Sequence, residues 1–204
     1  MINGQTNFNG KIEYQMVSHT GANSSDMQVW FGEDKIKVVT VVTKRSEEMT
    51  MDDETMIIDF RKSLLYRIND QTKVIRAISL LGKGNRNDTG GLTQTTATTT
   101  LAGFKCRMYT SGIQPVGDAP DQYKELMFWY AKDLAYAVPA ALANIQMIPA
   151  FTNGHIALKT EMKFTAGTFE MKLVTTAVKV QEMAGGVPDS LFVLPQGYTI
   201  QNVD

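Results

Sequence analysis

Cys106 is the only cysteine of the 204-residue chain, and a thiol can act as a nucleophile, bind a metal ion or pack as a small apolar side chain. The surrounding segment LAGFKCRMYT alternates apolar and charged residues, which is typical of a β-strand. Cys106 shares one face with Phe104 and Met108, and Lys105 and Arg107 lie on the other. A reactive thiol needs exposure and a nearby histidine, cation or helix N-terminus. We therefore predict that Cys106 is a buried core residue.

Two histidines are the other candidates for acid–base or metal chemistry. His19 ends the first predicted strand. His155 lies opposite the apolar side of its own strand, which carries Ile156, Leu158 and Met162. Two histidines and one cysteine provide little material for a transition-metal site, so we expect no metal.

Two polar stretches have compositions that ligand-binding loops also show. Asp52, Asp53 and Glu54 could hold calcium, but the EF-hand pattern is missing and a solvated turn is favoured. Residues 82–96, GKGNRNDTGGLTQTT, lack the GxxxxGK[ST] spacing of a phosphate-binding loop and predict a mobile surface loop. The motifs HExxH, CxxC and GxSxG are also missing. We expect no catalytic residue, no cofactor and no enzymatic activity, with a carboxylate pair from distant strands as the enzymatic alternative.

Composition restricts the class of protein. The length fits a single domain, residues 1–204. The formal net charge is −1 and no basic cluster occurs, which argues against a nucleic-acid partner. No apolar run approaches the roughly 20 residues of a transmembrane helix. The 12 methionines are either core filler or the deformable lining of a ligand site.

Alternation with period two, interrupted by turn residues, dominates the chain and predicts an antiparallel sheet. Residues 27–31 and 35–43 form a hairpin, and 55–80 form a three-stranded meander. Residues 126–130 are apolar on both faces, as in a strand covered on both sides. The last long strand, 168–183, changes phase near Thr175 and Thr176, which indicates a β-bulge in a strongly curved sheet.

One segment predicts a helix. VPAALANIQMIPAF, residues 138–151, has Pro139 in its first turn and Pro149 at its end. Its residues are apolar nearly all round, so we expect it to be buried against an open face of the sheet.

The first residues bear on localisation. MINGQTNFNGKIEY has neither the charged nor the hydrophobic region of a signal peptide. A polar QTN segment just before the first strand is typical of a mature exported protein, with the signal peptide presumed removed.

The order of these segments resembles a known family. MQVWFGEDKIKV, TMIIDFRKSLLYRIND, TLAGFKCRMYT, FWYAKDL and the closing LFVLPQGYTI together resemble an uncharacterised, GLPGLI-like or DUF-type family of exported bacterial proteins, related in pattern to the lipoprotein carriers LolA and LolB. The resemblance implies a mainly β fold, in which a strongly curved antiparallel sheet forms an incomplete barrel with one or two short helices against its concave face. It also implies a periplasmic or cell-surface location.

The carriers hold acyl chains between sheet and helices, so the resemblance implies a pocket for a lipid or another hydrophobic ligand. The alternative is a structural or interaction module of the cell envelope with a filled core and a protein partner. The residues predicted to line the pocket are Trp30, Phe128, Trp129, Leu142, Ile145, Met147, Met162 and Met171.

Overall fold

The computed structural model describes residues 7–19, 21–46, 52–81, 92–116, 122–137 and 154–203. In this part of the chain no helix is long and apolar enough to cross a membrane.

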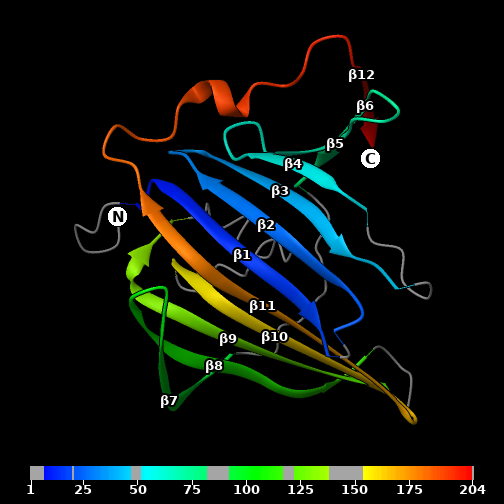
Figure 1. Cartoon of the computed structure of the whole chain (residues 1–204). Coiled ribbons are helices and arrows are strands. Elements are labelled where there is room, and N and C mark those ends of the chain that lie inside the picture. The colour runs from blue at the N-terminus through cyan, green and yellow to red at the C-terminus, as the bar shows by residue number, and fades with distance from the viewer. Residues whose placement is uncertain are drawn as a thin grey trace.

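Twelve strands form one sheet in the described residues (Figure 1). Their order across the sheet is β12-β6-β5-β4-β3-β2-β1-β11-β10-β9-β8-β7. The strands are β1 (Gly10–Ser18), β2 (Ser24–Phe31), β3 (Lys35–Lys44), β4 (Glu54–Asp59), β5 (Leu64–Asn69), β6 (Val74–Ser79), β7 (Thr93–Leu101), β8 (Phe104–Pro115), β9 (Gln122–Ala135), β10 (His155–Ala166), β11 (Phe169–Glu182) and β12 (Thr199–Val203).

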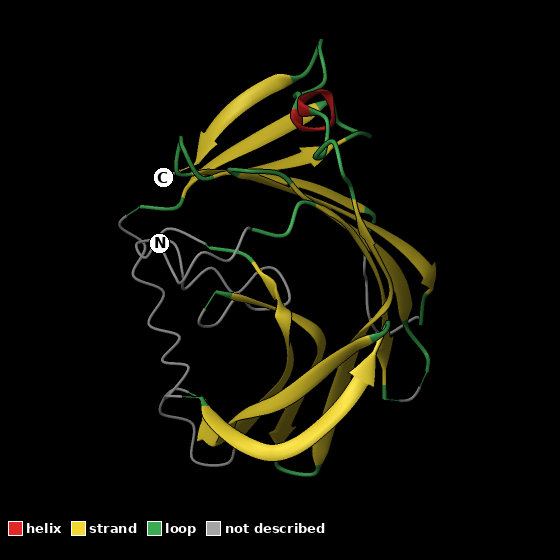
Figure 2. Ribbon diagram, turned by 90° about the vertical axis from the view of Figure 1, so that its left-hand side faces the viewer, coloured by secondary structure: helices red, strands yellow, loops and turns green. Residues whose placement is uncertain are grey.

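The sheet is open and strongly curved, as Figure 2 shows. Neighbouring strands are antiparallel except for β12, which lies parallel to β6. The predicted fold class, a curved and mainly antiparallel sheet, is confirmed, and the parallel edge strand was not foreseen. The predicted helix at 138–151 lies outside the described residues. Residues 93–96, predicted to belong to the loop 82–96, form the start of β7.

Tyr136 demonstrates the curvature. This residue directly follows β9, and three strands, β10, β11 and β1, lie between β9 and β2. Its ring nevertheless packs edge-on against Phe31 at the end of β2, with the centroids 5.3 Å apart. Tyr136 can span this distance only from within the curve of the sheet.

The main hydrophobic core, here called the central cluster, fills this inner side. It joins residues of β1 to β5 with residues of β8 to β11. Cys106 belongs to it and is only 1% exposed, so the predicted core role of the thiol is confirmed. The largest fully buried members of the central cluster are Ile12, Tyr14, Phe31, Ile36, Ile58, Leu65, Tyr136, Ile156 and Leu158.

A second cluster lies on the opposite face of β4 to β6. Because side chains alternate along a strand, Ile57 points away from the central cluster that contains Met56 and Ile58. The segment after β11 covers this face with a short 3₁₀ helix, η2 (Asp189–Phe192), and buries Phe192 against it. A Cβ atom at Gly32 would lie 2.9 Å from the Phe192 ring, so this contact requires glycine.

The predicted bulge in the last long strand is present. The register between β1 and β11 shifts between Glu13 and Tyr14, which pair with Lys179 and Ala177 and leave Val178 as the extra residue. The bulge lies two residues beyond Thr176, and β11 alternates regularly before it.

Candidate functional site

One face of β9, β10 and β11 carries six large apolar side chains. Met162 of β10 pairs with Leu173 of β11 and with Leu126 of β9, and Phe164 pairs with Met171. Directly paired residues in antiparallel strands project to the same side, so these side chains form one surface. We call Leu126, Phe128, Met162, Phe164, Met171 and Leu173 the apolar face. All except Phe128 are only partly buried.

The apolar face continues from the central cluster. Leu173, Thr175 and Ala177 alternate along β11 without a bulge, and Ala177 belongs to the central cluster. Met16 of β1 pairs with Thr175 and lies on the same side. On β11 the partly buried apolar surface therefore adjoins the central cluster, whereas Leu126 and Phe128 on β9 belong to a further cluster with Tyr109 and Tyr130.

The opposite face of β10 and β11 is charged. The Glu161 carboxylate forms ion pairs with Lys159 at 2.7 Å and with Lys172 at 2.8 Å. Burial opposes ionisation of Glu161, but the hydrogen bonds from the two lysines outweigh it and lower the pKa of the carboxyl below its usual value. The two faces of the same strands thus differ sharply in polarity.

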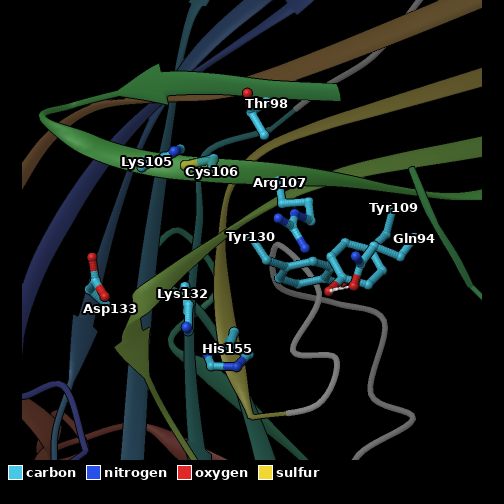
Figure 3. Close-up of a pocket in the computed structure, with 10 residues that line it drawn as sticks. All are labelled: Gln94, Thr98, Lys105, Cys106, Arg107, Tyr109, Tyr130, Lys132, Asp133 and His155. Atoms are coloured by element: carbon cyan, nitrogen blue, oxygen red, sulfur yellow. Dashed lines mark hydrogen bonds between the residues drawn. The ribbon is translucent and has the colours of Figure 1, made fainter. Parts of the chain in front are cut away.

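A pocket of about 520 Å³ lies beside the apolar face, on β7, β8, β9 and the start of β10 (Figure 3). Aromatic and polar side chains line it together with three cations. The lining residues are Gln94, Thr98, Lys105, Cys106, Arg107, Tyr109, Tyr130, Lys132, Asp133 and His155.

Aromatic rings connect the pocket to the apolar face. Tyr109 of β8 pairs with Phe128 of β9, so both project to the same side. The Tyr130 ring stacks on Phe128 at 5.8 Å and meets the Tyr109 ring edge-on at 5.4 Å. Arg107 pairs with Tyr130 and lies on this side too. The surface therefore changes from aliphatic through aromatic to cationic along β8 and β9.

The electrostatics of the pocket favour an anion. Among the described lining residues, Lys105, Arg107 and Lys132 are cationic and Asp133 is the one carboxylate. Among the described residues no carboxylate lies within ion-pair distance of Lys105 or Arg107. Nδ1 of His155 is buried, and no described residue forms a hydrogen bond with it.

Residues 8–198 match the family described as "Domain of unknown function (DUF4412)". The chain belongs to the DUF4412 family. Comparison with curated proteins gave no match.

One solved structure that resembles this DUF4412 domain is described as a "putative outer membrane lipoprotein-sorting protein domain" from Vibrio parahaemolyticus. The similarity covers 91% of this chain and 89% of that chain, with 10% identical residues and a TM-score of 0.36. At this level it carries no functional argument.

The DUF4412 domain brings together three of the residues predicted to bind a ligand. Phe128, Met162 and Met171 all lie on the apolar face. Trp129 follows Phe128 on the other side of β9, where it pairs with Lys159 and the lysine Nζ lies 4.5 Å from its ring.

Trp30 requires a correction. It alternates with Val29 and Phe31 of the central cluster, so it faces the other way and packs against the second cluster. Nζ of Lys11 lies 5.1 Å from its ring. The period of two in β2 already separates Trp30 from the inner side. Leu142, Ile145 and Met147 lie outside the described residues.

The cationic side of the site was missed. Arg107, Lys132, Tyr109 and Tyr130 carry no sequence motif, and none of them was predicted to bind a ligand. A signal was present in the alternation, which places Lys105, Arg107 and Tyr109 on one side of a strand. Their proximity to Lys132 and His155 depends on strand pairing that a single sequence does not specify.

The thiol in the wall of the pocket is not suited to nucleophilic chemistry. Burial raises the pKa of Cys106 to about 11, so the thiol is protonated near neutral pH. Its Sγ contacts the carbonyl oxygen of Phe104 at 3.5 Å.

The acidic cluster at residues 52–54 is partly neutralised by neighbouring groups. Arg45 lies 3.7 Å from Asp52 and 4.0 Å from Asp53. The backbone N–H of Val42 donates to Asp53 at 2.8 Å. In the described part of the chain no group of three or more His, Cys, Asp or Glu side chains could hold a metal ion.

Proposed function

We propose that the DUF4412 domain is a non-enzymatic protein of the cell envelope that binds a lipid or another hydrophobic ligand. The observation that supports this proposal is the apolar face. Large aliphatic and aromatic side chains stay partly exposed there, while the other face of β10 and β11 carries Lys159, Glu161 and Lys172.

The part of the apolar face that is in contact with water has a free-energy cost. Each square ångström of apolar surface removed from water stabilises a complex by about 25 cal/mol. A ligand that covered Met162, Phe164 and Leu173 would recover part of that cost. Methionine suits such a lining because its unbranched side chain adapts to irregular shapes.

The location in the periplasm or at the cell surface is part of the same proposal. It is supported by the resemblance of the sequence to exported bacterial proteins related in pattern to LolA and LolB. An envelope protein that delivers or receives the ligand would be the natural partner of such a domain.

Native mass spectrometry of protein purified without detergent, followed by extraction into organic solvent, tests the proposal. We expect a co-purifying mass that is released into the organic phase, or a mass gain when dodecanol is added. A clean apo mass with no gain on adding dodecanol would contradict ligand binding. It would instead favour an interaction module with a filled core.

A further inference from the structure

We infer that the pocket on β7 to β10 binds the anionic head group of an amphiphile whose acyl chain lies on the apolar face. This inference rests on the proposed function and adds to it the chemical class of the ligand. It depends on the continuity of two surfaces of opposite character.

The first step is the charge of the pocket. Lys105, Arg107 and Lys132 come from two adjacent strands, β8 and β9, and each side chain is exposed to solvent. Lys105 and Arg107 have no carboxylate within ion-pair distance among the described residues, so they repel one another, and a bound anion relieves that repulsion. A head group with a negative charge suits this cationic surface.

The second step is the hydrogen-bonding capacity. The planar guanidinium of Arg107 presents a fork of N–H donors that fits the oxygens of a phosphate or carboxylate. In Figure 3 Arg107 and Tyr130 lie close together, with Lys132 and His155 below them. His155, whose Nδ1 is buried without a hydrogen-bond partner in the described part of the chain, lines the same pocket.

The third step is the connection between head group and chain. Tyr130 and Phe128 stack on one another, so no charged side chain of β9 interrupts the path from the pocket to Leu126. Leu126 and Tyr130 are four positions apart on the strand, a distance of about 13 Å. The apolar face continues across β10 and β11 from there, which is enough length for a long acyl chain.

The fourth step concerns where charged side chains lie relative to the apolar face. On the opposite face of β10 and β11, Lys159 and Lys172 are both ion-paired with Glu161. The cations of the pocket, by contrast, lie at the end of the apolar path. An uncharged lipid would gain nothing from them, whereas an anionic amphiphile would use both surfaces.

Isothermal titration calorimetry with two ligands of equal chain length tests this inference. Dodecyl phosphate and dodecanol, both below the concentration at which they aggregate, are titrated into the wild-type protein, and inorganic phosphate serves as the third ligand. We expect dodecyl phosphate to bind at least about tenfold more tightly than dodecanol, because charge-assisted hydrogen bonds are worth at least this factor. Inorganic phosphate alone should bind much more weakly than dodecyl phosphate.

Substitutions identify the residues that cause the preference for dodecyl phosphate. Arg107→Gln combined with Lys132→Gln should remove most of the preference for dodecyl phosphate and leave the affinity for dodecanol unchanged. Lys179→Gln, at an exposed position of β11 outside the pocket, is the matched control and should leave both affinities unchanged. Circular dichroism checks that each variant is folded.

The outcomes separate the two proposals. Equal affinities for the two amphiphiles in the wild-type protein, or a preference that survives in the double variant, would overturn the head-group assignment and leave lipid binding intact. Inorganic phosphate binding as tightly as dodecyl phosphate would assign the pocket to a free anion and would also overturn it. Failure of both amphiphiles to bind would contradict the proposed function itself.

Discussion

The hydroxyl of Tyr136 donates a hydrogen bond of 2.8 Å to the carbonyl oxygen of Gly32, across the inner side of the sheet. The two residues are 104 positions apart in the sequence. Gly32 also contacts the Phe192 ring from the second cluster, so one turn is held from both sides of the sheet. Burial raises the pKa of the Tyr136 hydroxyl far above its usual value, which keeps it protonated as a donor.

Tyr136→Phe should therefore lower the free energy of unfolding. The change removes the buried hydrogen bond to the Gly32 carbonyl and a longer one of 3.4 Å to the Lys35 carbonyl, at a cost of about 1–3 kcal/mol. Urea denaturation monitored by circular dichroism measures the loss. Tyr109→Phe is the control, because its bond to Gln94 is exposed and should contribute much less. Equal effects of the two substitutions would show that the bond across the sheet is not an important support of the curvature.

The thiol of Cys106 should react very slowly in the folded protein. Its side chain is 1% exposed, and the raised pKa of about 11 leaves roughly 0.1% thiolate at pH 8. Labelling with 5,5′-dithiobis(2-nitrobenzoic acid) at pH 8 should be at least about a hundredfold slower in buffer than in 8 M urea. Rapid labelling of the folded protein would show that the pocket wall opens at Cys106.

The curved sheet could be predicted because period two is a local property of the sequence. The alternation around Cys106 correctly placed it in the core, and the phase change in the last long strand correctly indicated a bulge. The position of the bulge was two residues off, because it is set by pairing with Tyr14 on a distant strand. The parallel pairing of β12 with β6 was likewise not visible in either segment alone.

The candidate site was predicted only in part, for a related reason. Phe128, Met162 and Met171 have side chains whose chemistry suggests an apolar lining. Arg107 and Lys132 become notable only when β8 and β9 pair and place them at one pocket. Trp30 shows the opposite error, since its size suggested a ligand contact while its position in β2 directs it to the second cluster.

The Glu161 ion pairs should make stability depend on pH. A carboxyl whose pKa is lower in the folded than in the unfolded state stabilises the fold above its unfolded pKa, here about 4.5, and loses this contribution as the pH falls through the folded value. Glu161→Gln should therefore destabilise the protein at pH 7, and the difference from wild type should shrink below pH 4.5.

Urea midpoints measured between pH 3 and pH 7 give this difference directly. Glu182→Gln, at the exposed end of β11, controls for loss of one negative charge. A difference between Glu161→Gln and wild type that stays constant over this range would mean that the two lysines do not stabilise the ionised carboxylate.

The apolar face should lose ligand affinity when a charge is placed on it. Met162 lies between Leu126 and Leu173, so Met162→Glu puts a carboxylate where the acyl chain is expected to lie. A charge without a partner in an apolar contact costs several kcal/mol, and we expect dodecanol affinity to fall by at least about tenfold. The matched control is Val178→Glu at the bulge of β11, because Val178 is 51% exposed and lies outside the apolar face. Calorimetric titration of dodecanol into both variants makes the comparison. Similar affinities in Met162→Glu and Val178→Glu would place the ligand elsewhere on the molecule.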